Sequence, residues 1–485
     1  MKPTRRIIKG AVRIVLYGAA LVTLALIIIL VAAHLDSAPG SNAKTDSQST
    51  VSLYDNSGTD PASGLEVSHI PGNSTDDSFG TNPDDPSITE PGFSASIETD
   101  DNNNTTQPTT DIDSGLHPSL PDTTPSVGLA GQREGIQLAI DSVAEKYGAV
   151  GVQVAVVRNG RIVGAFAYGD ATKGTRPMTV DVKIRVASLS KVVLGMLVMR
   201  LGEVGYLGID ADIGDYWGAT VRNPNHVSTP VTIRQMLSHT SSIKVYDYGF
   251  FADGETIRRR FLDGSCFGTS TPGAIDSWNY NNYAFAALGL TIEVATDETV
   301  NDLAARYLFD PLGIDAAFGP GGVSGTDMLA TLYTNSGGVG RSVDEQKRTL
   351  GSTYPGERGE EFPGGLTISA YDLAKLVAVL ANDGVYNGIS VLTPESVSLM
   401  ETSQGRSGGF DQCLPLWRRT NLYGEEELFY HTGSNFGVYS LMSYNPVRGV
   451  GVVVLTTGAD GKRDADGIYA ICGEISEHIY AALGV

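Results

Sequence analysis

Apolar and polar positions divide the chain into three parts. Residues 14–35 form an almost uninterrupted apolar run of 22 positions, a length that matches a bilayer-spanning helix better than the roughly 7–15 residues of a secretory signal core. Residues 36–130 contain few large apolar side chains. From residue 131 to residue 485, apolar positions recur with the periods of helices and strands, which predicts one large folded domain.

Strands are predicted near both ends of the folded part. The turn Asn159-Gly160 separates two β-rich runs and is a strong hairpin signal. The pattern predicts a helix over 133–147, with Ile136, Leu138, Ile140 and Val143 on its apolar face, strands over 150–157, 162–167, 436–444 and 449–456, and a last helix over 465–483.

Residues 188 to about 400 have mainly helical periodicity, broken by Gly/Pro loops. Strands first and last with helices between them predict an α/β (α+β) fold. We expect an antiparallel sheet built from both chain ends and flanked by helices, plus an inserted, mainly helical subdomain.

The start of the chain predicts membrane attachment. Residues 1–13 carry five basic side chains and no acid, and basic flanks stay on the cytoplasmic side. We therefore predict that residues 1–35 are a cytoplasmic basic tail and a transmembrane signal anchor, in a single-pass protein of the cell membrane with its N-terminus inside and its folded domain extracellular. The alternative is a signal peptide cleaved after Val31-Ala32-Ala33, which would leave a secreted protein.

Residues 36–130 are rich in Ser, Thr, Asn and Pro and carry 16 acids against one base. Such a segment cannot bury enough apolar surface to repay its ordering entropy, and its like charges extend it. We predict a disordered acidic linker that holds residues 131–485, the folded domain, away from the membrane.

The remaining composition excludes several classes of protein. The folded part has a net charge of −11, which argues against nucleic acid as a partner. Three cysteines in an exported chain of this size do not make a disulfide scaffold, although a bridge between Cys266 and Cys413 stays open. No spacing resembles a metal site, so neither a metal nor another cofactor is expected.

Candidate chemistry begins with Ser188 and Lys191, which precede the apolar run 192–199. A helix starting at the serine would place the lysine one turn further on, with its amine close to the hydroxyl. Lost solvation favours the neutral amine, which makes it a possible base and the hydroxyl a possible nucleophile. A serine with a lysine three residues later also occurs by chance, so the pair needs partners.

Two later stretches supply partners. Tyr280 and Asn282 lie before the apolar run 284–290 and offer a phenol and an amide, unless the stretch is only an Asn-rich helix cap. His431, Thr432, Gly433 and Ser434 lie at the edge of a predicted strand, where a glycine lets a ligand approach the backbone and the hydroxyls can bind it.

Ser-x-x-Lys, then Tyr-x-Asn, then a basic residue followed by Thr-Gly resembles the penicillin-recognising serine hydrolases: class C β-lactamases, serine D-alanyl-D-alanine carboxypeptidases and related esterases. Residues 232–241, TIRQMLSHTS, match a further run of this family, and the resemblance spans about 140 to 457. It implies the β-lactamase/transpeptidase-like fold and that residues 131–485 are a serine hydrolase domain with an extracellular catalytic site.

The resemblance also implies roles. Ser188 would be the acylated nucleophile and Lys191 its proton acceptor or electrostatic activator. Tyr280 would pass protons to the leaving group and Asn282 would orient the lysine and the substrate amide. The backbone N–H groups of Ser188 and of a residue near Ser434 would bind the oxyanion. His239, in the run 232–241, is interpreted as a buried structural histidine.

The third motif departs from most β-lactamases, in which the resemblance implies Lys at the position of His431. Because a histidine is mostly neutral near pH 7, efficient antibiotic hydrolysis is less expected, with Arg418 or Arg419 as alternative sources of charge. The leading hypothesis is a D-alanyl-D-alanine carboxypeptidase-like enzyme that forms an acyl-enzyme with peptidoglycan peptides, with β-lactams as possible acylating ligands. The alternatives are an esterase or weak β-lactamase of the same fold, and a non-catalytic penicillin or wall-fragment sensor.

Overall fold

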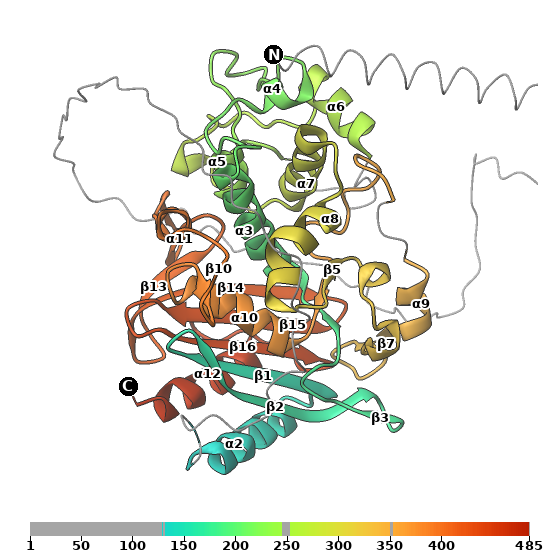
Figure 1. Ribbon diagram of the computed structural model, residues 1–485, viewed down its shortest axis with the longest axis vertical. Helices are drawn as coiled ribbons and strands as arrows, with labels where there is room; N and C mark the ends of the chain where they lie inside the picture. The colour runs from blue at the N-terminus through green and yellow to red at the C-terminus, as the bar shows by residue number, and fades with distance from the viewer. Residues whose placement is uncertain (1–128, 130, 245–252, 350–352, 485) are drawn as a thin grey trace, which may run out of the picture. The chain divides into compact units, whose positions relative to one another are not determined.

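The computed structural model describes residue 129 and residues 131–244, 253–349 and 353–484. A nine-stranded antiparallel sheet lies at its centre, in the strand order β11-β12-β13-β14-β15-β16-β1-β2-β3 (Figure 1). β1 and β16 pair from Gly151 opposite Thr457 to Arg158 opposite Val450. Strands from the two ends of the folded part are therefore neighbours, which confirms the predicted sheet. The strands are β1 (Gly151–Arg158), β2 (Arg161–Thr172), β3 (Arg176–Pro177), β11 (Gly405–Ser407), β12 (Phe410–Gln412), β13 (Trp417–Leu422), β14 (Glu425–Asn435), β15 (Val438–Asn445) and β16 (Val450–Thr457).

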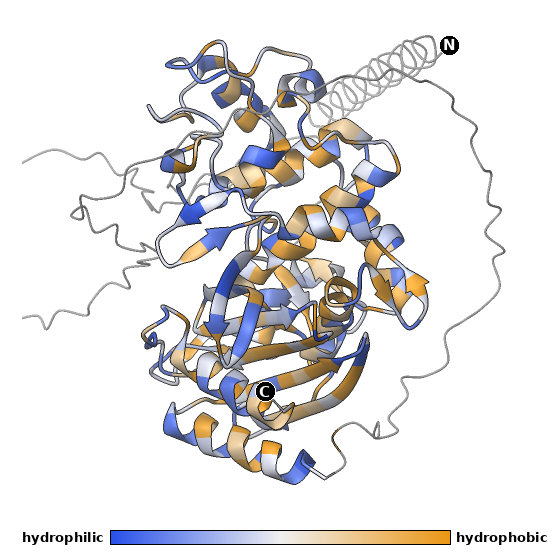
Figure 2. Cartoon of the chain, turned by 90° about the vertical axis from the view of Figure 1, so that its left-hand side faces the viewer, coloured by the Kyte–Doolittle hydropathy of each residue, from blue (hydrophilic) through white to orange (hydrophobic). Residues whose placement is uncertain are grey.

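The central strands are buried on both faces, which is why their sequences are apolar at nearly every position. In β1, Val152 and Val154 pack into one hydrophobic cluster with α2 (Arg133–Lys146) and α12 (Ala470–Ala482). The alternate residue Ala155 packs into a second cluster with α10 (Ala370–Leu380) and the inserted helices. Figure 2 shows the resulting concentration of apolar residues along the sheet.

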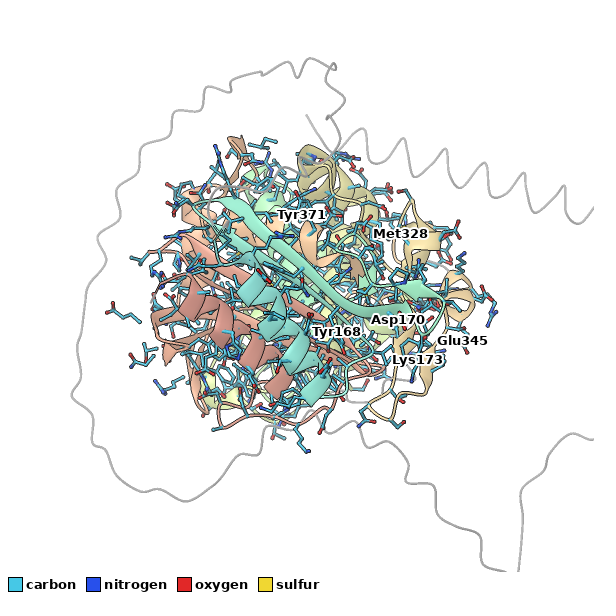
Figure 3. The ribbon with its side chains drawn as sticks, turned by 90° about the horizontal axis from the view of Figure 1, so that it is seen from below. Tyr168, Asp170, Lys173, Met328, Glu345 and Tyr371 are labelled. Carbon is cyan, nitrogen blue, oxygen red and sulfur yellow. The ribbon has the colours of Figure 1, made fainter. Side chains whose placement is uncertain are left out.

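Helices α2 and α12 lie side by side across one face of the sheet, as the view from below shows (Figure 3). α2 crosses β2, whose Tyr168 and Asp170 are labelled there. Burial of Ile136 and Ile140 agrees with the predicted apolar face of α2, but Leu138 is 63% exposed. Leu138 lies two residues from each of them, which on a helix places it on the opposite side.

The inserted part is mainly helical, as predicted, and also contains small sheets formed by β4-β8-β5, β6-β7 and β9-β10. Its helices are α3 (Ser190–Glu203), α4 (Ile213–Trp217), α5 (Ile233–Leu237), α6 (Gly254–Asp263), α7 (Asn282–Thr296), α8 (Val300–Ala304), α9 (Val343–Lys347) and α11 (Pro394–Glu401), and its strands are β4 (Ile184–Arg185), β5 (Ala317–Phe318), β6 (Leu332–Tyr333), β7 (Val339–Arg341), β8 (Leu366–Ile368), β9 (Val385–Tyr386) and β10 (Ile389–Ser390).

Several element boundaries differ from the predicted ones. The helix expected from Ser188 begins two residues later, because a 3-10 turn, η1 (Ala187–Leu189), precedes α3. β2 continues five residues beyond 167, to Thr172. The last helix begins at Ala470 instead of 465, because the Asp464 carboxylate accepts hydrogen bonds from two backbone N–H groups, of residues 466 and 468, and holds that segment as a turn.

All three cysteines lie among the described residues, and all are free and buried. The bridge considered between Cys266 and Cys413 is therefore absent. Each thiol instead donates to a backbone carbonyl, Cys266 to Arg260 and Cys413 to Glu401.

The predicted anchor at 14–35, and all of the predicted linker except residue 129, fall outside the described residues. Within the described ranges, the helices are too short or too polar to cross a bilayer.

Candidate active site

Ser188 is presented by a constrained turn at the start of α3. Ala187, in η1, has φ of +52°, in the left-handed region that costs a residue with a side chain about 1–2 kcal/mol. Such a conformation persists only where the surroundings hold it. Here Ser440 on β15 donates a 2.9 Å hydrogen bond to the carbonyl oxygen of Val186, so the sheet holds the turn and Ser188 is left half-buried.

The amine of Lys191 meets Ser188 from inside the protein. It donates to Ser188 Oγ over 3.0 Å and to the carbonyl oxygen of Pro363 over 2.7 Å. Its side chain is completely buried, and Nζ lies 4.8 Å from the ring centroid of Tyr280 and 5.5 Å from that of Phe285. The i, i+3 spacing thus joins the two groups although Ser188 lies in a 3-10 turn.

Tyr280 lies in the loop before α7, half-buried. Its ring is stacked obliquely against His239, with centroids 4.5 Å apart, and lies 6.2 Å from the ring of His431. Asn282 is the first residue of α7, but the helix is capped by its neighbour Asn281, which accepts from the backbone of Ala284 over 2.9 Å. The cap that the sequence offered as an alternative explanation therefore exists, and it uses a different asparagine.

β14 brings the third motif alongside Ser188. At Gly433, a Cβ atom would lie 2.9 Å from the backbone nitrogen of Ser188 and 2.7 Å from the oxygen of Val186. Only glycine permits this approach. Thr432 is buried and Ser434 is half-buried on the same strand.

The stretch 431–435 of β14 has one unpaired edge. On one side it pairs with β15 throughout. On the other side β13 pairs only as far as Trp417 opposite Tyr430, and no other described strand takes over. A run of backbone donors and acceptors is thus open beside Ser188, the arrangement that binds extended peptides.

His431 is neutral. Burial above all, and then the charge of Lys191, lower its pKa to about 3. Nδ1 donates to the carbonyl oxygen of Thr432 over 2.7 Å, and the ring stacks on Trp417 at 4.4 Å and 17°. It therefore adds no positive charge where most β-lactamases have Lys.

Arg418 and Arg419, the alternative sources of charge, each form an ion pair with an acid. Arg418 pairs with Asp411 at 2.6 Å and Arg419 pairs with Asp466 at 2.6 Å. Both arginines are thus engaged by acids of the same region, and a supply of charge to the site by either of them stays a prediction.

Two residues that support the site were not predicted from the sequence. The carbonyl of Pro363, next to Gly364-Gly365, accepts from Lys191 across 172 residues, and Trp417 supports His431 from β13. Only a signal for tertiary contact could have found them, since neither residue type suggests chemistry.

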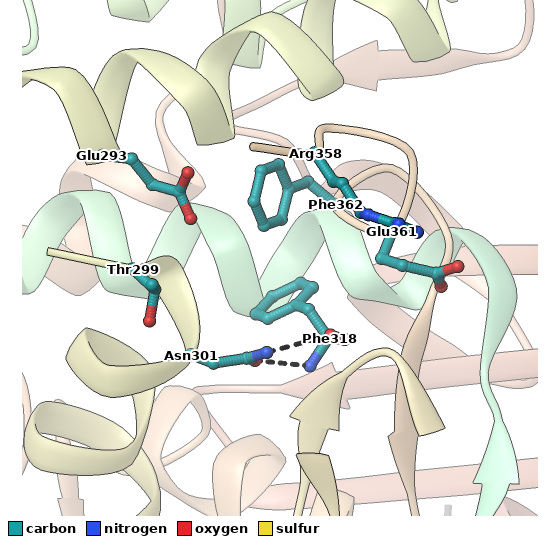
Figure 4. A pocket seen from close by; sticks show the side chains of 7 residues that line it. All are labelled: Glu293, Thr299, Asn301, Phe318, Arg358, Glu361 and Phe362. Carbon is teal, nitrogen blue, oxygen red and sulfur yellow. Dashed lines mark hydrogen bonds between the residues drawn. The ribbon is translucent and has the colours of Figure 1, made fainter. Parts of the chain in front are cut away.

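A cavity lies next to the loop that ends at Pro363, and none of the residues that line it belongs to the predicted site (Figure 4). In it, the buried carboxylate of Glu293 accepts from the backbone nitrogens of Val300 at 3.0 Å and Gly356 at 2.7 Å. Burial raises its pKa to about 7. The contact with Gly356 ties α7 to the loop that ends at Pro363, and the contact with Val300 ties α7 to α8, so Glu293 supports the site from outside.

Comparison with known proteins identifies the family of the chain. The family model described as "Beta-lactamase" matches residues 136–471. Penicillin-binding protein 4 of Amycolatopsis lactamdurans is 26% identical over 338 residues, which cover 66% of this chain and 84% of that protein. Esterase EstB of Burkholderia gladioli is 29% identical over 213 residues, covering 40% of this chain and only 54% of the esterase.

Solved structures share the fold. D-alanine carboxypeptidase AmpC from Burkholderia cenocepacia has a TM-score of 0.57 at 19% identity, covering 72% of this chain and 99% of that one. A class C β-lactamase from Rhodobacter sphaeroides has a TM-score of 0.55 at 18% identity, with 72% and 99% covered. At such identities the likeness concerns the fold alone.

Proposed function

The chain belongs to the beta-lactamase family and has the fold of its serine hydrolases, and from this premise we propose that it is a membrane-anchored, extracytoplasmic carboxypeptidase acting on the D-alanyl-D-alanine ends of peptidoglycan peptides. The observation that carries the proposal is the 3.0 Å hydrogen bond from Lys191 to Ser188 beside the unpaired edge of β14. The hydroxyl would supply a nucleophile and the edge would hold an extended peptide.

In the proposed reaction, Ser188 Oγ attacks the carbonyl carbon of the penultimate residue and its proton passes to Lys191 or Tyr280. The N–H groups of Ser188 and Ser434 stabilise the oxyanion, a contribution of about 3 kcal/mol each. Collapse breaks the C–N bond, and the leaving amine takes a proton through Tyr280, while Asn282 orients the lysine and the substrate amide. Water, deprotonated by the same pair, then hydrolyses the acyl ester.

Labelling with a fluorescent penicillin tests the nucleophile. We expect a covalent adduct on the wild type and none on Ser188→Ala, whereas Ser398→Ala, at an exposed serine of α11, keeps the label. Release of D-alanine from a D-Ala-D-Ala peptide then tests the substrate class. Equal labelling of wild type and Ser188→Ala would refute the proposal.

A short-chain esterase is the second candidate. The neutral His431 and the aromatic stack of Trp417 on it favour an uncharged acyl group, and one relative is an esterase by name. Turnover of nitrophenyl acetate without release of D-alanine would favour it. A penicillin adduct that never turns over would favour a sensor instead.

A further inference from the structure

His239 accepts hydrogen bonds from the backbone on both sides of Tyr280. The N–H of Asn279 donates to the carbonyl oxygen of His239 over 2.8 Å, and the N–H of Asn281 donates to Nδ1 of its ring over 3.1 Å. The ring itself packs on Tyr280 at 4.5 Å. A single residue therefore fixes the chain before the tyrosine, the chain after it and one face of its ring.

This conformation of His239 costs free energy, which indicates that the surrounding structure enforces it. His239 is 2% exposed and has φ of +58°, a left-handed conformation that is uncommon for a residue with a side chain. Its Nε2 atom is buried and hydrogen-bonds to none of the described residues. Such features gather where geometry is held for a purpose.

The contact with Asn281 requires an uncharged ring. Nδ1 accepts a hydrogen bond, so the ring proton lies on Nε2, and an imidazolium would carry a second proton on Nδ1 and lose the contact. Burial first, then the charge of Lys191, lowers the pKa of His239 well below its ordinary value. The ring therefore keeps its lone pair on Nδ1 at neutral pH.

We propose that His239 is a positioning residue that holds Tyr280 in register with Ser188 and Lys191. The inference rests on the proposed function, because it assigns His239 a task only if Tyr280 transfers protons in acylation. His239 does not touch the reacting atoms and acts through the tyrosine. Misplacement of a catalytic group by about 1 Å costs about 100-fold in rate.

Two substitutions at position 239 separate the positioning of Tyr280 from the mere filling of space by the side chain. Asn at 239 places an acceptor oxygen one bond beyond Cγ, about where Nδ1 lies, and it tolerates positive φ. Gln places its oxygen one bond further and loses the contact. For acylation by a fluorescent penicillin, we expect H239N to stay within about threefold of wild type. H239Q should lower the maximal rate about 100-fold and leave the half-saturating concentration within about threefold.

A double-mutant cycle with Tyr280→Phe supplies the decisive readout. If His239 acts through the tyrosine, H239Q slows wild type but adds less than about a threefold loss to Y280F, because coupled residues are non-additive. H239N that folds but acylates as slowly as H239Q overturns the inference, as does an equal loss in both backgrounds.

Melting temperatures report on folding. Should H239Q not fold, H239A takes its place in the cycle, and the requirement that H239N acylates almost normally still stands. Failure of the proposed function looks different: the wild type itself then shows no labelling that depends on Ser188.

Discussion

The amine of Lys191 lies 3.0 Å from the hydroxyl of Ser188, and both groups belong to a segment whose backbone is held from other elements. β15 anchors Val186 ahead of the turn, and Pro363 accepts the second hydrogen bond of the lysine. The fold itself thus holds the two groups within hydrogen-bonding distance, which is the condition for general acid–base catalysis.

Replacement of Lys191 by Met should abolish most acylation while preserving the fold, because Met fills a similar volume without the amine. General acid–base groups contribute about 100- to 10,000-fold, so we expect at least a 100-fold slower reaction with fluorescent penicillin. Lys347→Met, at a surface pair with Asp327, is the control. Acylation of K191M at the wild-type rate would contradict the role.

Gly433→Ala should impair both the site and the fold. The added Cβ would lie 2.9 Å from the nitrogen of Ser188 and 2.4 Å from Ser440 Oγ, so β14 or the serine turn has to move. We expect a lower melting temperature and loss of penicillin labelling. Gly135→Ala on α2 meets no atom within 4 Å and should stabilise by about 0.5–1 kcal/mol, so a harmless G433A would refute the close approach.

Much of this architecture could be predicted from local patterns. The apolar runs around Asn159-Gly160 and at the end of the chain specify strands that need partners, and the order of Ser188, Tyr280 and His431 suggested a common site. The sheet pairing and the Ser188–Lys191 contact agree with those predictions. The catalytic roles themselves stay predictions.

The unpredicted parts depend on contacts distant in the sequence. β11, β12 and β13 are short or polar strands, so the hydrophobic periodicity does not predict them. β14 begins with three glutamates, Glu425 to Glu427, and its start therefore has no apolar pattern either. His239 looked like an ordinary buried histidine, because only the folded chain places Asn279 and Asn281 at its carbonyl and its ring.

Glu401 on α11 should make stability depend on pH. Burial raises its pKa from 4.5 to about 7, so the unfolded chain loses the proton first as pH rises. Stability therefore falls between about pH 4.5 and 7, by on the order of 3 kcal/mol from this group. In urea unfolding of the full-length protein, E401Q should reduce this fall, and E395Q, at an exposed position of the same helix, should not. An unchanged slope in E401Q would contradict the burial of the carboxylate.

The three cysteines should react only after unfolding. Burial raises the pKa of Cys266 and of Cys413 to about 12, and that of Cys472 also rises, so thiolate is scarce in the folded protein. Alkylation followed by intact mass should add no label to the native protein and three labels in denaturant without reductant. A single label in denaturant would indicate a disulfide and refute the free thiols.

Because His431 is neutral, we expect Arg341 to supply the charge for an acidic substrate group. Its guanidinium lies 4.7 Å from the ring of Phe436, two residues beyond Ser434. Its side chain is exposed, and it forms no ion pair with another of the described residues. Arg185, on the same ring at 5.7 Å, is already paired with Glu361.

Arg341→Ala should therefore raise KM for a D-Ala-D-Ala peptide about three- to tenfold, as expected for an exposed charge contact worth roughly 1 kcal/mol, and leave kcat unchanged. Turnover of the uncharged nitrophenyl acetate should stay the same, since it offers no carboxylate. Arg161→Ala is the matched control, because Arg161 is also exposed. It lies opposite Arg158 in the β1–β2 register, at the other end of β1 from Gly151. Added salt should raise KM for the peptide in wild type and less so in R341A, because exposed charges are screened. An equal loss on peptide and ester would instead mean that Arg341 supports the loop over Phe436 and binds no substrate.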